Sequence, residues 1–357
     1  MQLIEKSRLK DGMVLGQDIY FGNQMVLRKG TVLDTRLIDR LRQFNVPRVM
    51  IEDEVIATYE ANIYQCSSYS QRIQNSPEFK KFQKDYDVEV TEFQSMLNGV
   101  VERNQEINVE NLYHQVVTLL KDTGNTINAF DMVQNLRHYD DSTYAHSINV
   151  GLLSNVFASW LGMDEEQKKL VTVAGILHDI GKTKMPLYLI QKPGKLNSQE
   201  YAVIQQHTNM GFQILKENNL NIHICFTALQ HHERCDGGGY PGGRKQKEID
   251  EFAKIVSIVD VYDAMTSPRV YRKPMCPFDV INLFEEEGLQ KYESAYILTF
   301  LQRIAETYLN ERVRLNDGRE GALVYIDRQA LSRPTILIDG TAVDLRKYKD
   351  LAIEEIL

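Results

Sequence analysis

The sequence predicts a mainly α-helical protein, in which a helical bundle is flanked by a small β-rich N-terminal domain and a short C-terminal β meander. Three observations lead to this prediction. Apolar residues recur at three- and four-residue steps from about residue 77 to residue 310, which is the period of an amphipathic helix. Residues 1–54 hold short apolar runs between turn residues, as short strands do. The tail from residue 313 returns to this pattern.

Composition sets the class of protein. The chain has 357 residues, enough for two or three domains, with 43% hydrophobic and 25% charged residues, as in ordinary globular proteins. No apolar run approaches the ~20 residues that cross a bilayer. Residues 1–6 lack the basic-then-apolar layout of a signal peptide. We therefore expect a cytoplasmic protein without a membrane span.

The charge balance narrows the partners. The formal net charge is −8, from 41 basic and 49 acidic residues. Duplex nucleic acid is not an expected partner, because its binding needs many cationic contacts. A small anionic substrate stays open, since bound metals and a few basic residues set the local field. The four cysteines form no CxxC pair, so we expect neither a structural zinc site nor a disulfide framework.

Residues 1–54 form the first predicted domain. Three short apolar runs are separated by turn residues that contain glycine, and they predict strands at residues 13–15, 19–21 and 25–27. A short amphipathic helix is expected near residues 35–44, followed by one more strand near residues 48–51.

Residues 55–119 are predicted to be a helical linker. Ser76 suits a helix cap and Pro77 suits the first helical position. An apolar stripe follows at helical spacing: Phe79, Phe82, Tyr86, Val90, Phe93, Leu97 and Val100. We expect this stripe to pack on neighbouring helices, and a homodimer that uses it is the alternative.

Residues 120–312 are predicted to be the catalytic domain, built from helices with recognisable ends. Asp164 suits the cap of a helix that ends at residues 178–181, where Gly181 is expected as the C-terminal cap. Asn197 and Glu200 resemble a capping box for the helix that bears His207. A further helix is expected from about residue 251 to 266, and a bundle of such helices can bring their ends together.

Residues 313–357 are predicted to form the β meander. Turn signals at residues 316–318 and 339–340 flank apolar runs at residues 323–326 and 336–338.

The stretch from residue 231 to residue 241, HHERCDGGGYP, is the most informative part of the sequence. His231 and His232 would point about 100° apart on a helix, so one apolar face cannot bury both cheaply. The glycines that follow let backbone approach a ligand closely. Other side chains that bind metals well and pack poorly complete a set able to hold two metal ions: His146, His178, Asp179, His207, His231, His232 and Asp260.

These residue types point to metal-assisted hydrolysis of a phosphoester. Imidazole and carboxylate suit iron, manganese, zinc and related ions. The two oxygens of Asp179 can bridge two metals about 3.5–4 Å apart, and such a pair lowers the pKa of a shared water toward ~7. The resulting hydroxide can attack phosphorus while the metals neutralise the phosphoryl oxygens. Lys182, Arg269 and Arg272 supply cations that suit phosphate.

A single helical histidine is more often a hydrogen-bonded structural residue than a metal ligand. His114, His138 and His223 are placed in that structural class. His146 and His207 are placed among the ligands because they belong to the ordered set.

The ordered set carries a resemblance. Residues from about 120 to 310 resemble an HD-GYP domain, a branch of the HD phosphohydrolase superfamily. The matching segments are YAHSINV at 144–150, HDIGK at 178–182, HTNMG at 207–211, HHERCDGGGYP at 231–241 and VDVYDAMTS at 259–267, closing at Arg269, Tyr271 and Arg272.

The resemblance implies a phosphodiesterase that hydrolyses cyclic di-GMP to linear pGpG, with further hydrolysis to GMP left open. It implies one metal ion held by His146, His178, Asp179 and Asp260, and a second held by Asp179, His207, His231 and His232. Asp179 and Lys182 would be the catalytic residues. The substrate would contact Lys182, Arg269, Arg272 and Tyr240.

Two departures from the family pattern matter. Some members carry a glutamate four residues before the first histidine, where it supports a third metal ion, but Ser142 stands here. We therefore expect two divalent ions, iron or manganese by resemblance, and no third. After the GYP turn the family shows Gly-Leu-x-Gly, whereas this chain has GRKQ at 243–246, which leaves the local loop shape open.

Two alternative functions remain open from the sequence. The first is a receptor that binds a cyclic dinucleotide without hydrolysis, which ranks lower because no expected metal ligand is missing. The second is an HD phosphohydrolase for another nucleotide, because only the pocket would differ.

Overall fold

The structure is a computed structural model. It describes residues 2–5, 9–10, 13–21, 24–31, 33, 37–38, 41, 48–51, 68–103, 105–121, 129–136, 143–192, 194–267 and 274–357. By internal contacts the chain separates into two compact units. Unit 1 comprises residues 1–79, 123–128 and 304–357, and unit 2 comprises residues 80–122 and 129–303. Each unit is described by itself.

The N-terminal part of unit 1 contains two antiparallel strand pairs. Strand β1 (Gln2–Glu5) pairs with β4 (Arg48–Ile51), and β2 (Ile19–Phe21) pairs with β3 (Gln24–Leu27). The expected strands at 19–21, 25–27 and 48–51 are thereby confirmed, while β1 carries no signal that the sequence analysis used. Their core includes Leu15, Leu27, Leu33 and Leu41, all fully buried.

The helix expected near residues 35–44 lies largely outside the described residues. Residues 37–38 and 41 are described there, and they are helical.

The C-terminal part of unit 1 is a five-stranded antiparallel sheet in the order β8-β7-β6-β5-β9. Its strands are β5 (Arg312–Leu315), β6 (Glu320–Asp327), β7 (Ala330–Ile338), β8 (Thr341–Asp344) and β9 (Ile353–Ile356). The turns at Gly318 and Gly340 have φ of 86° and 79°, where glycine meets no steric cost. Strands β5 to β8 confirm the meander, and β9 extends it by pairing with β5.

Unit 2 is helical, and several of its helices begin or end where capping residues and apolar spacing predicted. The helical part of the chain begins with α3 (Tyr69–Asn75) and α4 (Pro77–Arg103). The helices that follow are α5 (Val109–Lys121), α6 (Ala129–Asn135), α7 (Thr143–Trp160), α8 (Glu165–Leu177), η2 (Ile180–Lys184), α9 (Leu187–Ile190), α10 (Ser198–Gln205), α11 (His207–Glu217), α12 (Ile222–Gln230), η3 (Gln246–Glu248), α13 (Glu251–Thr266), α14 (Pro277–Leu283), η4 (Phe284–Gly288), α15 (Leu289–Lys291) and α16 (Ser294–Thr307).

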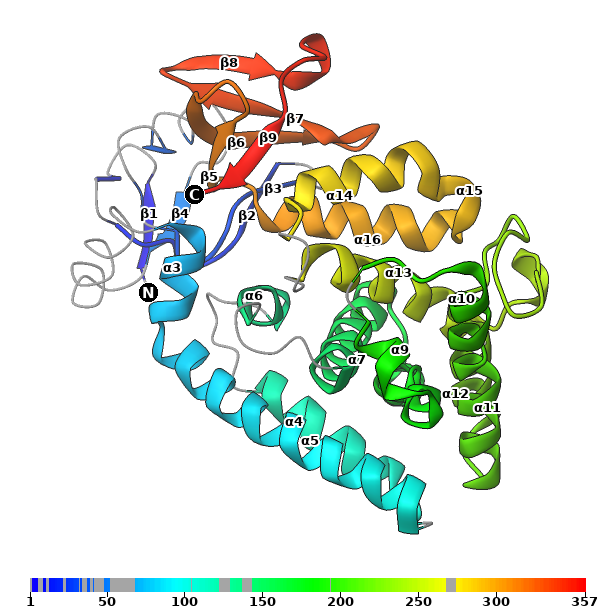
Figure 1. The fold of residues 1–357 in the computed structure, drawn as a ribbon. Helices are drawn as coiled ribbons and strands as arrows, with labels where there is room; N and C mark the ends of the chain where they lie inside the picture. Colours follow the sequence, from blue (N-terminus) through cyan, green and yellow to red (C-terminus); the bar gives the residue numbers. More distant parts are fainter. Residues whose placement is uncertain are drawn as a thin grey trace. The chain divides into compact units, whose positions relative to one another are not determined.

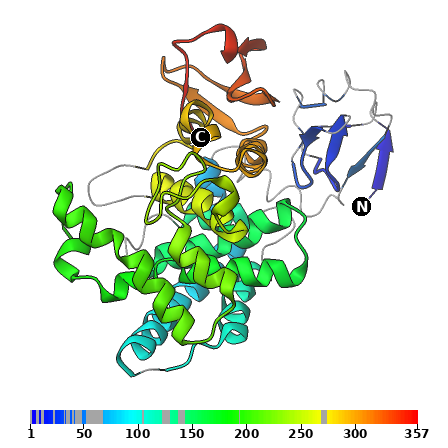
Figure 2. The same cartoon turned by 90° about the vertical axis from the view of Figure 1, so that its right-hand side faces the viewer.

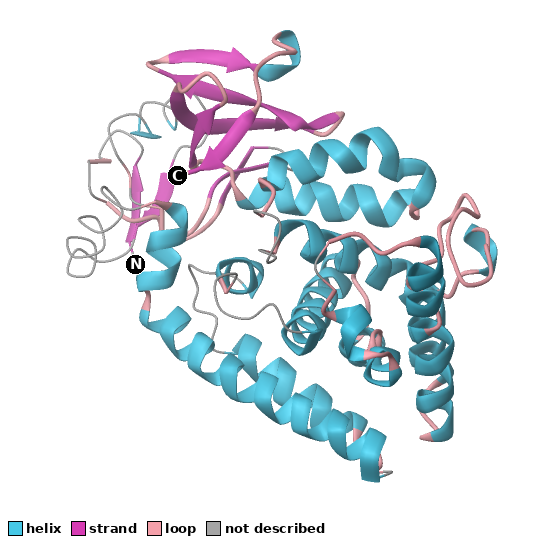
Figure 3. Ribbon diagram, in the orientation of Figure 1, coloured by secondary structure: helices cyan, strands magenta, loops and turns pink. Residues whose placement is uncertain are grey.

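In unit 2, helices α7, α8, α12 and α13 pack on one another. Figures 1 and 2 show the helices of this unit from two sides. Helix α7 packs on α8 and α13, and α12 packs on α8, α11 and α13. Among the described residues, the named strands all precede residue 52 or follow residue 311, so helices make up the body between them (Figure 3). The predicted mainly α-helical fold with flanking β units is confirmed. Of the helices described, none combines the length and apolar character that a bilayer crossing requires.

Helix α4 begins at Pro77, where the Ser76 hydroxyl accepts the Phe79 N–H at 3.0 Å. The seven stripe residues from Phe79 to Val100 are all buried. Within unit 2, the Tyr86 hydroxyl donates to Asn149 Oδ1 at 2.7 Å. The stripe residues thus pack within a single chain. The homodimer stays a prediction, and the apolar stripe no longer supports it.

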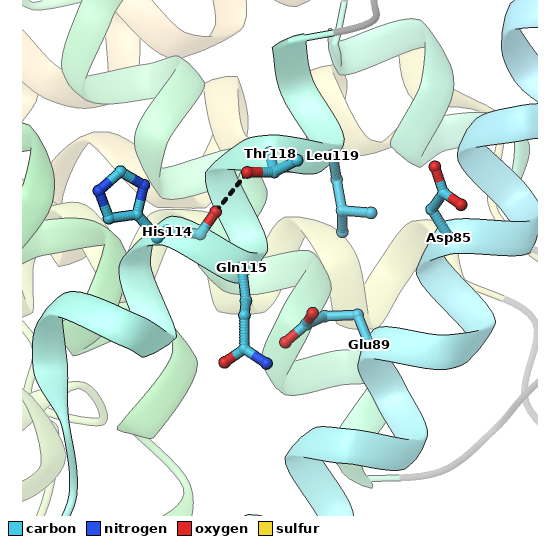
Figure 4. Close-up of a pocket in the computed structure, with 6 residues that line it drawn as sticks. All are labelled: Asp85, Glu89, His114, Gln115, Thr118 and Leu119. Atoms are coloured by element: carbon cyan, nitrogen blue, oxygen red, sulfur yellow. Dashed lines mark hydrogen bonds between the residues drawn. The ribbon is translucent and has the colours of Figure 1, made fainter.

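Glu89 is a buried acid on α4, with 7% of its surface exposed. It lines a cleft of about 340 Å³ between α4 and α5, together with Asp85, His114, Gln115, Thr118 and Leu119 (Figure 4). Burial, followed by repulsion from Glu92, raises the pKa of Glu89 from 4.5 to about 7. The cleft contains none of the metal-ligand candidates, so this acid affects stability rather than the predicted chemistry.

We expect Glu89→Gln to raise the thermal midpoint at pH 8 by a few degrees and to leave it nearly unchanged at pH 4. Because folding raises the pKa of this acid, its contribution to stability is present below about pH 4.5 and is lost as the pH rises through about 7. Glutamine removes the cost of burying the charge. Calorimetry of both proteins from pH 4 to pH 8 measures the difference, with Glu102→Gln on the exposed side of α4 as the control. Parallel curves for wild type and Glu89→Gln would contradict the prediction.

Candidate metal centre

The structure brings together all seven predicted metal ligands. Their donor atoms form two groups, and within each group they lie within 4.8 Å of one another. One group is Asp179, His207, His231 and His232, and the other is His146, His178 and Asp260. They come from the ends of α8 and α12, the start of α11, and the interiors of α7 and α13.

Helix α8 places two of these residues at its end. The Asp164 side chain accepts the Gln167 N–H in a full capping box, so the predicted start of α8 is confirmed. The helix ends at Leu177, and the chain turns at Asp179, with φ −102° and ψ 10°, into the short helix η2. His178 and Asp179 are adjacent in sequence, but the turn lets their side chains join different ligand groups, and both side chains are buried.

The prediction that Gly181 caps this helix is wrong. Gly181 lies inside η2, and its φ is not among the positive values that a glycine cap needs. A Cβ on Gly181 would lie 1.9 Å from the His207 backbone oxygen and 2.6 Å from the Gly211 nitrogen. Glycine is needed here because η2 and α11 approach each other backbone to backbone.

The prediction that the helix with the Asn197–Glu200 capping box bears His207 is also wrong. The capping box itself is present at the start of α10. The Gln206 N–H donates to Val203 O at 3.1 Å, which tightens and ends this helix, and His207 is the first residue of α11. A new helix begins at the ligand, and a local capping signal at Asn197 and Glu200 could not reveal that break.

Backbone carbonyls orient three of the histidine rings. Because a carbonyl can only accept, each Nδ1 carries a proton, and a neutral ring then presents the lone pair of its Nε2 to the cluster. The pairs are His178 Nδ1 with Gly175 O at 2.6 Å, His207 Nδ1 with Ile204 O at 2.6 Å, and His231 Nδ1 with Ala228 O at 3.1 Å.

A carboxylate orients the fourth ring. His146 Nδ1 lies 2.8 Å from Asp263 Oδ2, while His146 Nε2 lies 3.1 Å from Asp260 Oδ1. Asp263 was not among the predicted site residues. Its spacing of three residues from Asp260 on one helix was the available signal, because such residues share a face.

Two buried atoms at the centre lack a hydrogen-bond partner: His178 Nε2 and Asp179 Oδ1. Asp179 Oδ2 lies 3.3 Å from His178 Nε2, and Asp179 Oδ1 lies 3.3 Å from His207 Nε2. The two oxygens of one carboxylate thus face the two groups. Buried unpaired polar atoms are costly unless something satisfies them, so this donor set fits two cations bridged by Asp179.

The electrostatics put most ligands in the protonation states that metal binding requires. Burial opposes ionisation of Asp179 and is the largest single effect, but the Lys182 ammonium, His178 and His207 together outweigh it and hold the carboxyl pKa well below its usual value. Burial opposes ionisation of Asp260 too, but His146, His178 and His232 together outweigh burial and hold the pKa of this carboxyl well below its usual value. Burial lowers the pKa of His231 to about 4 and that of His232 well below the usual value.

His146 is the exception. Burial lowers its pKa, but the hydrogen bonds that the ring donates to Asp260 and Asp263, together with the charges of these carboxylates, outweigh burial and raise the pKa to about 10. Without a cation nearby, a proton on His146 balances the two carboxylates. A metal ion at this position would take over that role from the proton.

The loop after α12 covers the second group. The Tyr240 ring stacks on His232, with centroids 4.6 Å apart and planes at 28°, and the Tyr240 N–H donates to His232 O at 3.2 Å. A Cβ on Gly239 would lie 2.4 Å from the Arg234 nitrogen, so glycine lets the loop fold back on itself. Tyr240 therefore lies beside the metal-ligand candidates, where its pocket role was predicted.

Glu233 closes this loop, and the sequence analysis assigned it no role. Its buried carboxylate accepts the Gly242 N–H at 2.7 Å and the Arg244 N–H at 2.9 Å. These two bonds hold the start of the segment, residues 243–246, in which the sequence departs from Gly-Leu-x-Gly. The loop shape is thus held by a carboxylate whose partners are backbone groups, which leave no side-chain pattern to find.

Several predicted positions fall elsewhere. Arg269, Arg272, Ser142 and His138 lie outside the described residues. His223 pairs with Asp250 at 2.6 Å, which agrees with a structural role. His114 is exposed on α5.

We expect Asp263→Asn to weaken metal binding about 10- to 100-fold, because a carboxylate that orients a ligating histidine contributes about that much. Asparagine keeps the size but can no longer balance a charged His146. Metal competition with a chelator, monitored on both proteins, measures the change, with Asp279→Asn on α14 as the control. An unchanged affinity would exclude Asp263 as the positioning residue for His146.

Comparison with known proteins finds similarity over part of the chain. Residues 128–295 match the family described as HD domain. A cyclic di-GMP phosphodiesterase of Pseudomonas aeruginosa is 31% identical over 212 residues, which cover 59% of this chain and 51% of that protein. A cyclic di-GMP phosphodiesterase of Thermotoga maritima is 36% identical over 191 residues, which cover 51% of each. The chain thus spans about half the length of these curated relatives.

Two further similarities concern substrate and structure. The 3'3'-cGAMP-specific phosphodiesterase 1 of Vibrio cholerae is 39% identical over 145 residues, which cover 41% of this chain and 34% of that protein. Among solved structures, Bd1817, described as an HDG"Y"P protein from Bdellovibrio bacteriovorus, matches with a TM-score of 0.49 and 18% identity. The match covers 84% of this chain and 97% of that one.

Proposed function

We propose that the chain is a metal-dependent phosphodiesterase for cyclic dinucleotides, since residues 128–295 match the HD-domain family and the same region carries motifs that resemble those of HD-GYP domains. The observation that carries the proposal is the pair of adjacent His/Asp groups with Asp179 facing both. When bound there, two divalent cations supply Lewis acidity, which lowers the pKa of water and neutralises phosphoryl oxygens. We assign the catalytic unit to residues 120–312, the linker to 55–119, and the flanking domains to 1–54 and 313–357.

The protein's own residues have distinct roles in this proposal. His146, His178, Asp179 and Asp260 hold one cation, and Asp179, His207, His231 and His232 hold the other. The backbone carbonyls behind the imidazoles fix which nitrogen faces the site, so little reorganisation is needed when a cation binds.

Lys182 forms an ion pair with Asp179 at the edge of the site and is partly exposed, so its ammonium can also meet a phosphate from solvent. Tyr240 bounds the pocket beside His232. Burial raises the pKa of Tyr240 well above its usual value, so its hydroxyl stays protonated and can donate a hydrogen bond. Arg269 and Arg272 are proposed to contact phosphate on the resemblance alone.

The finer proposal is that the substrate is cyclic di-GMP, with linear pGpG as the first product and GMP as a second. The names of the Pseudomonas and Thermotoga relatives support this choice. A specific observation favours a second candidate, 3'3'-cGAMP, because the Vibrio relative named for that substrate has the higher identity over its shorter match. For the metal we propose two ions of iron or manganese, with Ser142 unable to support a third.

The test uses protein purified without oxygen and reconstituted separately with iron and with manganese. Bound metal is counted per chain, and each form is then incubated with cyclic di-GMP and with 3'3'-cGAMP. Chromatography resolves the products, and chelated protein is the control. We expect two ions per chain and a linear product that the chelated protein does not make.

Each other outcome bears on the proposal. Faster hydrolysis of 3'3'-cGAMP would keep the phosphodiesterase and replace its substrate. Two bound ions and tight nucleotide binding without hydrolysis would overturn the enzyme in favour of a receptor. Hydrolysis of neither nucleotide, with turnover of another phosphoester, would assign a different HD phosphohydrolase.

A further inference from the structure

An exposed tyrosine stands next to the metal groups without serving the hydrophobic core. Tyr201 lies on α10 and is 47% exposed. Its ring centroid is 6.1 Å from that of Tyr240, with the planes at 77°. Tyr240 in turn stacks on His232. The rings of His232, Tyr240 and Tyr201 therefore form a row that leads from the second metal group to the surface.

Packing gives no reason for this ring. Helix α10 has no buried residue, so Tyr201 does not attach this helix to a hydrophobic core. Large apolar groups at the surface are common singly, but here the ring is in contact with Tyr240, which stacks on the metal-ligand candidate His232. Since the two tyrosine planes are nearly perpendicular, they do not cover each other face to face. Tyr201 keeps ring surface for a third aromatic group.

The backbone that carries Tyr201 is held firmly although it is exposed. The preceding residue, Glu200, accepts the Asn197 N–H at 2.8 Å and the Lys192 ammonium at 2.6 Å. The Tyr201 N–H itself donates to Asn197 O at 2.9 Å. This capped first turn limits the positions of the ring, so the ring can bind a flat partner at a low cost in conformational entropy.

We propose that Tyr201 is a substrate-binding residue whose ring stacks on a nucleobase of the cyclic dinucleotide. The proposal rests on the proposed function, because it requires a scissile phosphate at the metal groups. In a nucleotide the base is joined to the phosphate through one sugar, so the base lies one sugar away from a phosphate bound at the metal groups. A base on the side of Tyr240 that faces away from His232 would contact the ring of Tyr201. A neutral tyrosine face stacks on purines of either kind. Tyr201 therefore adds affinity for dinucleotides in general without choosing guanine over adenine.

The test compares Tyr201→Ala and Tyr201→Phe with wild type, after the number of metal ions per chain has been measured for each protein. Stacking of one base on an aromatic ring corresponds to about a 5- to 150-fold change in binding. We expect Tyr201→Ala to raise the KM for cyclic di-GMP and for 3'3'-cGAMP within that range and by similar factors. Affinity for a non-hydrolysable phosphorothioate analogue should fall in parallel, while kcat changes less than twofold. Phenylalanine should restore both, because it keeps the ring.

The control is Tyr325→Ala, a tyrosine of similar exposure, 44%, in the C-terminal sheet. It should leave both KM values at the wild-type level. An unchanged KM in Tyr201→Ala, in a wild-type background that hydrolyses either nucleotide, would overturn the role of Tyr201 alone. A fall in kcat with constant KM would overturn it as well. Wild type that neither binds nor hydrolyses a cyclic dinucleotide would instead overturn the proposed function.

Discussion

Asp179→Asn should abolish the binding of both metal ions and lower turnover of cyclic dinucleotides by about 10³-fold or more, since metal activation is worth several kcal/mol. The reason is geometric. One oxygen of Asp179 lies 3.3 Å from His178 Nε2 in the first group, and the other lies 3.3 Å from His207 Nε2 in the second. Asparagine keeps the volume but offers one neutral oxygen, so neither group retains a shared anionic ligand. Lys182 also loses its ion-pair partner.

Metal content by elemental analysis and turnover by product chromatography measure this change on the same samples. Asp85→Asn is the matched control, because it removes an exposed carboxylate on α4 that lines the separate cleft. We expect the control to retain two ions and full turnover. A variant at Asp179 that kept both ions would exclude the bridging role, whatever its activity.

Gly181→Ala should destabilise the protein by about 3 kcal/mol, the upper end of what overpacking typically costs, and should remove the second metal ion. The added Cβ would stand 1.9 Å from the His207 oxygen and 2.6 Å from the Gly211 nitrogen. Both are backbone atoms, so relief requires a shift of α11 as a whole. Such a shift carries the His207 imidazole away from Asp179.

Denaturant unfolding measures the stability, and metal counting measures the loss of the second ion. Gly238→Ala is the control, because its new Cβ would be nearest to the flexible end of the Asp236 side chain, at 3.2 Å. We expect the control to unfold near the wild-type midpoint. Wild-type stability in Gly181→Ala would mean that η2 and α11 can separate without cost, and the close approach would lose its importance.

Local signals in the sequence predicted much of the fold. Pro77 starts α4, Asp164 caps α8, and α13 has the bounds that its pattern predicted. These signals work because each concerns hydrogen bonds within one turn or apolar spacing within one helix. The seven candidate ligands were likewise predictable, since their residue types bind metals and pack poorly, and the order of their motifs resembles one family.

The supporting residues were harder to predict. Asp263 and Glu233 act on His146 and on the loop after α12, and their partners lie far away in sequence or are backbone atoms. Tyr201 belongs to none of the motifs in the sequence, and its proposed role follows from the contact of its ring with Tyr240. For such residues the identity of the side chain says little until the neighbour is known.

The sequence by itself determined which chemistry is available: a mainly helical chain, short β units at both ends, and a complete set of imidazoles and carboxylates for two cations. The tertiary structure alone decided how these groups meet. It ended α10 before His207, it required glycine at 181 for the contact between η2 and α11, and it turned the two oxygens of Asp179 toward different histidines. The physical reason is that helix caps and periodicity are local, whereas a two-cation site depends on distances between separate helices, which are set by the packing of their side chains and backbones.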